Sequence, residues 1–531
     1  MDNKKDFGVL YGQKTTEDAL LIYSSYEDSK ASPHTGDFIV LTERHGNGQK
    51  FLARVEAEIY DEDPIFRSQD KTLVAVHYAR IAKRDLSVRD KQKMFSYTYK
   101  VKILGVFEGD GDNFTTAVRK LPVVSYHARY LSDQEFSNIL NRTNEKGVNI
   151  GNLCIGEEVK FKEQSIQFDI SKLREKRTMI FAQSGFGKTN LMKIMLYHMI
   201  KDNEYGKLIF DLNGEYCFSS NNTVGLADID KKEIRDNLVI FTDKNTHGKH
   251  SNVRINMIKH LTVRDILDFG TGFSEVMKAF LLHLDTENAS DFVKNMELYA
   301  KNSEELHKKY PDFFSKKKDG TPDASAKRTI MAIRKRVLHV MRGLHQEDSK
   351  MLDDIHKALK EGKTVIVDLS LRDNDGAKIV STILVREIFE NNKTHFTEEK
   401  TNEVIDCVIC VEEAQNVISE EFVKSNANPF VRVAKEGRKF KMGMIAITQR
   451  PSAIAEEIRS QAENFFAFYM GNSDDIKALV RSNINYDGVI SQFLQTETIR
   501  GNLYMVSADQ SFALPVRVIK FEDMIPPKKN Q

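Results

Sequence analysis

The chain has 531 residues, 40% of them hydrophobic and 29% charged, which is typical of a globular protein with about two to four domains. Its 78 Lys and Arg nearly balance 77 Asp and Glu, so the net charge of +1 excludes a strongly basic or acidic chain but permits a basic patch inside a pore. No long apolar run and no apolar segment near residue 1 occur, so we expect no membrane span, no secretory signal and a cytoplasmic location. Cys407 and Cys410 are expected to pack inside a strand rather than to bind zinc or act in redox chemistry.

Residues 1–165 are rich in short apolar runs separated by turn residues, for example residues 38–41 and the long run 95–107. This spacing predicts a small N-terminal β-barrel, with one helix near residues 131–140. An edge strand over residues 72–81 is expected to pair with a neighbouring subunit. No catalytic constellation occurs in this region, so we interpret it as a domain for assembly or partner docking.

A phosphate-binding loop follows the first strand of an α/β region that begins near residue 166. The pattern is Ala182-x4-Gly187-Lys188-Thr189, with Ala at the first position where Gly is usual, between an apolar strand and a helix. Glycines let backbone N–H groups converge on phosphate oxygens, and the helix N-terminus favours negative charge. Lys188 is expected to reach the β- and γ-phosphates of ATP, and the Thr189 hydroxyl to bind Mg²⁺. The predicted nucleotide-binding residues are Gln183, Ser184, Gly185, Phe186, Gly187, Lys188, Thr189 and Asn190.

Three later strands end in the carboxylates Asp211, Asp368 and Glu412, and only the third is followed directly by another carboxylate. The carboxyl ends of parallel strands border the nucleotide crevice. ATP hydrolysis needs a carboxylate that supports the metal and a group that activates water. We therefore predict that Glu412 supports Mg²⁺ through water and that Glu413 is the general base; the alternative is a solvated strand end.

Two further polar residues are candidates for catalysis. Gln449 ends the next strand and is expected to sense the γ-phosphate or to orient water, unless it is an ordinary polar strand end. Arg438 lies in a charged loop ahead of that strand. Such loops often line subunit boundaries, so Arg438 is expected to act in trans at a neighbour's site; the alternative is a surface arginine.

Residues 260–362 interrupt the α/β pattern with a mostly helical, strongly charged insertion, in which residues 316–318 and 328–342 are basic. A solvated helical insertion and a surface for nucleic acid or a partner both remain open. The pattern predicts a core with a mainly parallel sheet between helices over residues 166–259 and 363–514. Residues 515–531 are expected to form a C-terminal tail.

Six motifs occur in one order between residues 166 and 520, and together they resemble the HerA/FtsK group of additional-strand P-loop ATPases, HerA most closely. The first 165 residues are also similar in pattern to the N-terminal barrel of HerA proteins. HerA proteins commonly have Asp-Glu where this chain has Glu412-Glu413, and His where it has Gln415. The motifs cover residues 182–189, 211–216, 367–370, 411–415, 436–439 and 448–452.

The resemblance implies a RecA-like core in a homo-hexameric ring, with ATP and Mg²⁺ bound between subunits and double-stranded DNA in a central channel. By position, it gives Glu413, Arg438 and Gln449 the roles of catalytic carboxylate, trans arginine and sensor. Proteins of this family work with a nuclease in DNA-end resection, or with nuclease or NADase subunits in bacterial anti-phage defence. A separate effector protein is therefore expected here.

The leading hypothesis is an ATP-hydrolysing ring motor that translocates double-stranded DNA. The alternative is an ATP-regulated structural ring that scaffolds an effector enzyme without processive translocation. A conjugation-type or protein-transport ATPase fits less well, because the sequence predicts no membrane segment.

Overall fold

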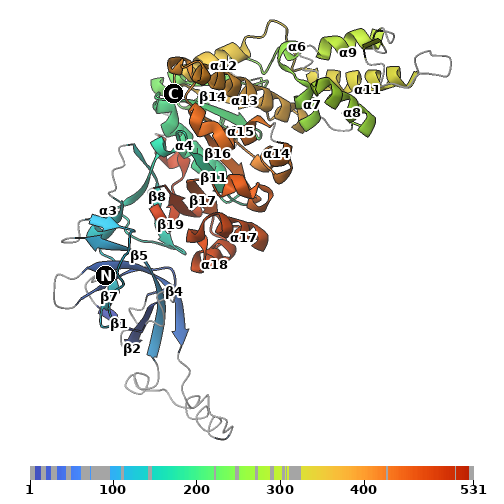
Figure 1. Cartoon of the computed structure of the whole chain (residues 1–531). Coiled ribbons are helices and arrows are strands. Elements are labelled where there is room, and N and C mark those ends of the chain that lie inside the picture. The colour runs from blue at the N-terminus through green and yellow to red at the C-terminus, as the bar shows by residue number, and fades with distance from the viewer. Residues whose placement is uncertain are drawn as a thin grey trace. The chain divides into compact units, whose positions relative to one another are not determined.

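The computed structural model divides the chain into two compact units (Figure 1), Met1–Asp169 with Asn483–Val518 and Ile170–Ser482 with Ile519–Gln531. None of the described helices is long and apolar enough to span a membrane. The structure describes residues 6–12, 20–25, 33–43, 49–60, 72, 96–108, 113–140, 146–219, 223–245, 250–269, 273–286, 292–301, 305, 308–309, 324–425, 428–508 and 510–525.

The first unit contains an antiparallel barrel, which confirms the predicted N-terminal fold. Its strands lie in the order β2-β1-β7-β3-β4-β5-β6, and β2 also pairs with β5, which closes the ring from β2 to β5. One face of the sheet is fully buried, as at Ile22, Ile39 and Val55, because alternate residues of each strand point to the same side. The bounds are β1 Asp6–Gly12, β2 Leu20–Ser25, β3 Phe38–Thr42, β4 Lys50–Tyr60, β5 Ser96–Glu108, β6 Asn113–Thr115 and β7 His127–Tyr130.

The same unit holds a second antiparallel sheet in which β19 lies between β8 and β18. Because β19 pairs with β8, residues 483–518 belong to this unit. From the sequence we expected residues 363–514 to be part of the ATPase core and the C-terminal tail to begin at residue 515. The expected edge strand at 72–81 lies outside the described residues except for position 72. The elements are α3 Asp133–Leu140, β8 Gly147–Ile155, β9 Glu158–Val159, β10 Ser165–Asp169, η8 Ile484–Tyr486, α18 Val489–Thr496, β18 Asn502–Ser507 and β19 Gln510–Val518.

The second unit is built on a parallel sheet with the order β17-β11-β16-β15-β12-β14-β13. Every residue of β12, β14, β15 and β16 is buried, as expected of a sheet covered on both faces. Burial raises the pKa of Cys407 and Cys410 within β15, which agrees with a packing role. The strands are β11 Arg177–Phe181, β12 Gly206–Asp211, β13 Leu238–Phe241, β14 Thr364–Asp368, β15 Cys407–Val411, β16 Met442–Thr448 and β17 Asn464–Phe468.

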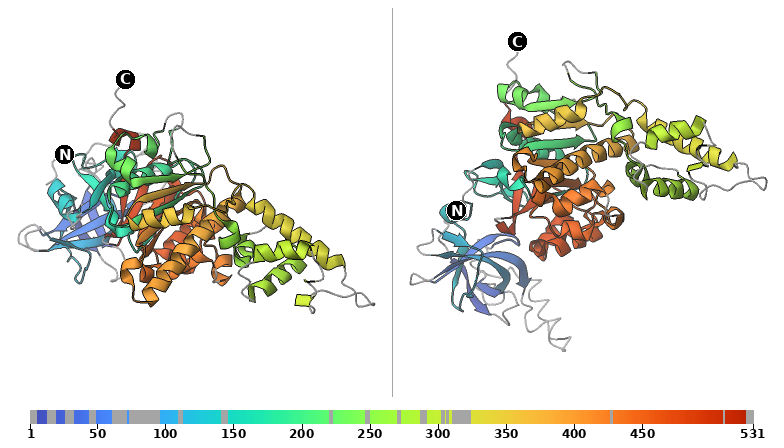
Figure 2. Two further views of the ribbon diagram at one scale, coloured as in Figure 1. Left: turned by 90° about the horizontal axis from the view of Figure 1, so that it is seen from above. Right: turned by 45° about the horizontal axis from the view of Figure 1, so that its top comes forward.

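Helices cover both faces of this parallel sheet (Figure 2), which is the RecA-like α/β arrangement predicted from the sequence. The longest, α13, begins after Asp373, whose carboxylate accepts a hydrogen bond from the backbone N–H of Gly376 at 2.8 Å. The helices and turns are η2 Ile170–Leu173, α4 Lys188–Lys201, η3 Leu226–Asp228, α5 Lys232–Asn237, α12 Met351–Lys360, α13 Asn374–Thr397, η4 Thr401–Glu403, η5 Ala414–Asn416, α14 Glu420–Ser425, α15 Pro429–Glu436, η6 Gly437–Phe440, η7 Pro451–Ala453, α16 Glu456–Arg459, α17 Ser473–Ser482 and η9 Phe521–Met524.

A helical insertion between β13 and β14 confirms the predicted break in the α/β pattern. Its helices pack on one another, α9 on α11 and α7 on α8. The basic residues 316–318 lie outside the described part of the chain, whereas residues 328–341 lie on α11. The insertion consists of α6 Met257–His260, α7 Val263–Phe269, α8 Glu275–Thr286, α9 Phe292–Lys301 and α11 Ala324–Met341.

Candidate active site

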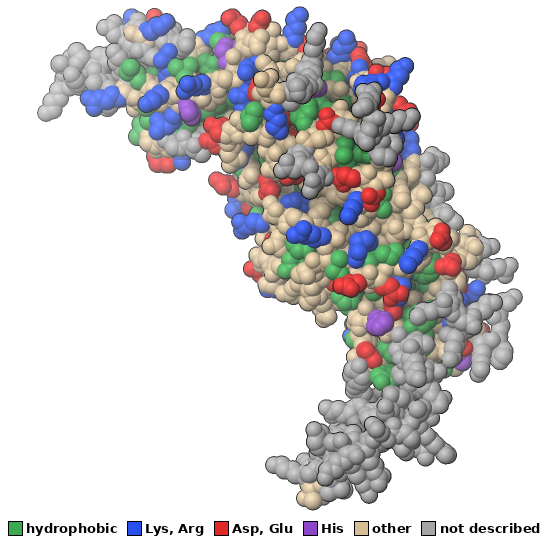
Figure 3. Space-filling model, turned by 180° about the vertical axis from the view of Figure 1, so that it is seen from behind, with side chains coloured by type: hydrophobic (Ala, Val, Ile, Leu, Met, Phe, Trp, Pro, Cys, Tyr) green, Lys and Arg blue, Asp and Glu red, His purple; other side chains and the backbone are tan. Residues whose placement is uncertain are grey.

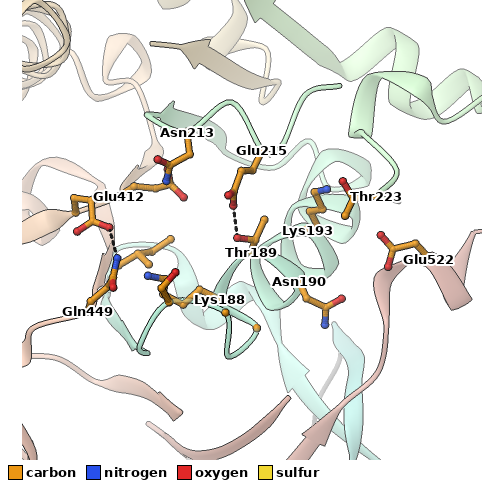
Figure 4. A pocket seen from close by; sticks show the side chains of 15 residues that line it. Lys188, Thr189, Asn190, Lys193, Asn213, Glu215, Thr223, Glu412, Gln449 and Glu522 are labelled. Atoms are coloured by element: carbon orange, nitrogen blue, oxygen red, sulfur yellow. Dashed lines mark hydrogen bonds between the residues drawn. The ribbon is translucent and has the colours of Figure 1, made fainter. Parts of the chain in front are cut away.

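A cavity of about 530 Å³ lies at the carboxyl ends of the central parallel strands (Figure 4). It joins the loop after β11 and the start of α4 to the residues that follow β12, β15 and β16, and Thr223 and Glu522 complete its lining. The lining residues are Ser184, Gly185, Gly187, Lys188, Thr189, Asn190, Lys193, Asn213, Glu215, Thr223, Glu412, Glu413, Ile447, Gln449 and Glu522.

The loop between β11 and α4 has the backbone of a phosphate cradle. Gly185 and Gly187 have φ values of +83° and +115°, which residues with a Cβ rarely adopt. Gly187 precedes α4 and provides no capping side chain, so the first N–H groups of the helix are left for another acceptor. An anion in the cavity would meet these donors and the positive end of a 14-residue helix.

Lys188 begins α4 and faces three carboxylates across the cavity. Burial lowers the pKa of this ammonium, and Glu413, Glu412 and Glu215 act in the opposite direction. A cation held in this setting is suited to bind phosphate oxygens as a point charge.

A tight turn after β12 brings Glu215 next to Thr189, the second residue of α4. The fully buried Asp211 accepts hydrogen bonds from the backbone N–H groups of Gly214, Glu215 and Tyr216 at 2.7, 3.1 and 3.0 Å. Burial raises the pKa of Asp211, and these three N–H groups oppose the shift. The turn presents Glu215 to Thr189, whose hydroxyl donates a hydrogen bond to the Glu215 carboxylate at 2.5 Å (Figure 4). Asp211 is therefore a structural carboxylate, and Glu215 is the one that enters the cavity.

Glu412 closes β15 and is held by the same turn. Its carboxylate accepts hydrogen bonds from the Tyr216 hydroxyl at 2.6 Å and from the Leu212 N–H and Asn213 amide, both at 3.3 Å. Burial raises its pKa to about 8, and the neighbouring charge of Asp211 contributes. Since both oxygens already have donors, this geometry fits indirect support of a metal better than direct ligation.

Glu413 lies between two glutamine amides. Gln449 donates a hydrogen bond to one carboxylate oxygen at 3.0 Å, and Gln415 donates to the other at 2.7 Å. The Thr448 hydroxyl in turn donates to the Gln415 amide oxygen at 2.6 Å. Glu413 itself has a φ of +46°, an uncommon conformation for a residue with a side chain. The structure thus brings the predicted base and the predicted sensor into direct contact.

Arg438 is not part of this cavity. It lies exposed in η6, just before the start of β16, whereas Gln449 follows the end of that strand. A strand of seven residues spans roughly 20 Å, so Arg438 lies at the opposite edge of the sheet from the P-loop of its own chain.

Three other residues predicted to bind nucleotide make different contacts. The Asn190 amide donates a hydrogen bond to the Ile519 carbonyl at 2.7 Å and accepts one from the Phe521 N–H at 2.8 Å. Phe186 stacks on Tyr469 with ring centroids 4.6 Å apart. Phe186 and Gln183 do not line the cavity, whereas Asn190 borders it.

Sequence reasoning did not assign the cavity residues Lys193, Asn213, Glu215, Thr223 and Glu522 to the site. Two of them, Asn213 and Glu215, lie in the segment Asp211-Leu-Asn-Gly-Glu-Tyr216. This segment indicated a site because it follows a buried strand whose end borders the P-loop. Lys193 lies one helical turn after Thr189 on α4 and donates a hydrogen bond to the Val224 carbonyl at 3.0 Å.

The donor set suits Mg²⁺. The Thr189 hydroxyl and the Glu215 carboxylate already meet in the cavity, and both are oxygen ligands of the kind that Mg²⁺ prefers. Mg²⁺ usually takes one or two carboxylates together with substrate phosphates and water, which matches a site beside a phosphate cradle.

Comparisons with known proteins find HerA proteins among the sequence relatives of this chain. A family model described as "Helicase HerA, central domain" matches residues 148–388. The DNA double-strand break repair helicase HerA of Sulfurisphaera tokodaii is 25% identical over 412 residues, which cover 76% of this chain and 74% of that protein. The HerA of Saccharolobus solfataricus is 24% identical over 412 residues, with coverage of 76% and 74%. The solved structure of the bacterial conjugative coupling protein TrwB is 9% identical, with a TM-score of 0.45 over 72% of this chain and 90% of TrwB.

Proposed function

We propose that the chain is a P-loop ATPase of the HerA/FtsK group and a ring motor that hydrolyses ATP to translocate double-stranded DNA. One observation carries this proposal: Glu413 faces the P-loop cavity with a glutamine amide on each oxygen, while Lys188 enters the same cavity from α4. A cradle that only binds phosphate needs no oriented carboxylate, whereas hydrolysis needs one to activate water.

Each residue then has a defined role. The P-loop N–H groups and Lys188 hold the phosphates of ATP, and Glu413 accepts a proton from the attacking water. Gln415 and Gln449 fix the Glu413 carboxylate, so its free lone pairs point in a constant direction. Thr189 and Glu215 would hold Mg²⁺, which neutralises charge on the phosphates when bound, and Glu412 supports this group through the turn after β12.

The same proposal makes the active site a shared one. Arg438 is exposed and lies far from its own cavity, so in a homo-hexamer it is free to reach the cavity of a neighbour. An arginine supplied in trans stabilises the charge of the transition state and links hydrolysis to assembly. DNA would occupy the central channel of that ring.

We further propose that this motor works in the cytoplasm with a separate nuclease or NADase effector, either in anti-phage defence or in DNA-end processing. The likeness of the six sequence motifs to HerA proteins supports this part of the proposal. The barrel of the first unit is the proposed docking and assembly domain.

Steady-state ATP hydrolysis with and without double-stranded DNA tests the motor. We expect DNA to stimulate the wild-type rate, Lys188→Ala to lose nucleotide binding, and Glu413→Gln to bind ATP but to hydrolyse it about 10² to 10⁴ times more slowly. Glu233→Gln, which changes an exposed carboxylate on α5, is the matched control. A wild-type rate that is identical with and without DNA would argue against a DNA motor.

One observation favours a second candidate, an ATP-regulated ring that scaffolds an effector. Glu412 is hydrogen-bonded on both oxygens and has a pKa of about 8, so slow hydrolysis with ATP acting as a switch is compatible with this site. This candidate predicts that Glu413→Gln leaves a purified complex with the effector fully active. Loss of effector activity in that variant would favour the motor.

A further inference from the structure

The insertion carries a row of cationic side chains along α11 and the turn that follows it. Arg328, Lys335 and Arg342 are exposed, and His339 lies between the last two on the same face. The spacing of seven between Arg328 and Lys335, with His339 four residues further on, keeps these three on one side of α11, and Arg342 continues the row in the turn directly after the helix. Figure 3 shows Lys and Arg side chains gathered over the insertion, at the upper left of that view.

This row, which we call the α11 stripe, is not neutralised by the rest of the described chain. No ion pair or side-chain hydrogen bond of Arg328, Lys335 or Arg342 occurs among the described residues. Exposed lysines and arginines elsewhere do have acidic partners, for example Lys360 with Glu403. Two such cations on α11 and a third in the turn directly after it create a positive potential that attracts a polyanion.

The stripe is also connected to the nucleotide cavity by a short series of contacts. Gly343, directly after Arg342, lies beside the guanidinium of Arg372, which a Cβ at this position would meet, and Arg372 forms an ion pair with Asp243. The adjacent Lys244 contacts the carboxylate of Asp368 at 3.2 Å and the carbonyl of Gly214 at 3.4 Å.

Gly214 precedes Glu215, which lines the cavity. The end of the stripe is therefore linked to the edge of the sheet that borders the cavity. A surface placed there is positioned to respond to the nucleotide.

From these features we infer that the α11 stripe binds the phosphate backbone of double-stranded DNA during translocation. The inference rests on the proposed function and adds the surface that holds the substrate. Along α11, the seven-residue step from Arg328 to Lys335 is about 10 Å, close to the major-groove width of about 12 Å. Long Arg and Lys side chains at this spacing reach phosphates on both edges of the groove.

An acidic protein surface fits the stripe less well. Protein interfaces centre on apolar and aromatic anchors, and Met331, exposed by 52%, is the only large exposed apolar side chain among the described residues of α11. Regularly spaced cations without such anchors match a regularly spaced polyanion better.

The test compares two triple variants in the full chain. Arg328→Gln, Lys335→Gln and Arg342→Gln remove the stripe, whereas Lys232→Gln, Lys357→Gln and Lys393→Gln remove three exposed lysines from α5, α12 and α13. Both triple variants lose the same amount of positive charge, so the comparison separates the effect of position on DNA binding from the effect of net charge. Fluorescence anisotropy of a labelled duplex, measured over a range of salt concentrations, gives the affinity and the number of phosphate contacts.

We expect the stripe variant to bind duplex DNA about tenfold or more weakly at moderate salt and its salt slope to fall by roughly 2 to 3. The control variant should keep the wild-type values, and both should keep the wild-type ATPase rate without DNA. A charge-conserving pair, Arg328→Lys with Arg342→Lys, should also keep the wild-type salt slope. A wild-type ATPase rate without DNA and an unchanged salt slope in the Arg-to-Lys pair would show that the stripe variant loses DNA binding without losing its fold.

Equal affinities and slopes for the stripe and control variants would overturn the inference while leaving the motor in place. A wild-type protein that does not bind duplex DNA would overturn both the inference and the proposed function. If only the stripe variant loses binding to an acidic protein, and neither variant loses binding to DNA, the stripe is a protein-docking surface and the inference is wrong.

Discussion

Adjacent carboxylates at the end of β15 have opposite environments. Glu412 is 7% exposed and its oxygens accept hydrogen bonds from Tyr216 and the β12 turn, while Glu413 faces the cavity between two amides. Burial raises the pKa of Glu412 to about 8. Two acidic residues whose surroundings differ in this way are suited to separate roles, one structural and one as a base.

The raised pKa of Glu412 predicts a specific dependence of stability on pH. Because the folded protein binds this proton more tightly than the unfolded chain, the stabilisation is complete below the ordinary value of 4.5 and is lost as pH rises to about 8. The loss is on the order of a few kcal/mol. Glu412→Gln, which keeps the shape and the hydrogen-bonding oxygen, should flatten this fall.

Thermal unfolding of the nucleotide-free protein between pH 5 and pH 9, or roughly that range, measures the effect. Glu233→Gln, on the surface of α5, is the control and should follow the wild-type curve. Parallel curves for wild type and Glu412→Gln would show that Glu412 is ionised throughout this range.

At the scale of elements, local patterns were predictable and pairings between distant segments were not. A continuous strand-loop-helix pattern identifies Lys188 and Thr189 as phosphate and metal ligands, so their place in the site could be predicted from local sequence. Glu215 meets Thr189 only because the fold brings the end of β12 and the start of α4 to one cavity, although β16 and β15 lie between β12 and β11 in the sheet; the residues around Glu215 indicate a strand end but not this partner. The pairing of β19 with β8, more than 350 residues earlier in the chain, was likewise beyond local sequence rules.

The contact between α4 and the chain after β19 yields a prediction that separates binding from stability. Asn190→Ala removes both hydrogen bonds to the Ile519 and Phe521 backbone, so we expect about 1 to 3 kcal/mol of destabilisation. ATP affinity should fall only a few-fold, because the phosphate donors of the P-loop remain. Urea unfolding and binding of a fluorescent ATP analogue measure the two effects, and Asn252→Ala, at an exposed position of the same unit, is the control for unfolding.

A loss of ATP binding as complete as that of Lys188→Ala, with unchanged stability, would restore the nucleotide-binding role that the sequence predicted for Asn190. The structure favours the other outcome, since both polar atoms of that amide already have backbone partners.

For the whole molecule, the proposed trans role of Arg438 predicts that one chain does not complete an active site, because Arg438 lies far from its own P-loop. The two lie at opposite edges of the sheet, separated by the length of β16. Lys188→Ala and Arg438→Ala should therefore each lose DNA-stimulated ATP hydrolysis for different reasons. In a ring assembled from both variants, an intact Lys188 from one subunit meets an intact Arg438 from the next.

Mixing the two inactive variants before assembly should restore activity, up to about a quarter of the sites when they combine at random. Mixing Lys188→Ala with Glu413→Gln is the matched control, because both changes lie in the same cavity of one chain and every cavity in the mixed ring keeps a defect. Recovery in the first mixture alone requires that neighbours share the site. Equal inactivity in both mixtures, or an Arg438→Ala protein with the wild-type rate, would instead make Arg438 a surface residue and the active site complete within a single subunit.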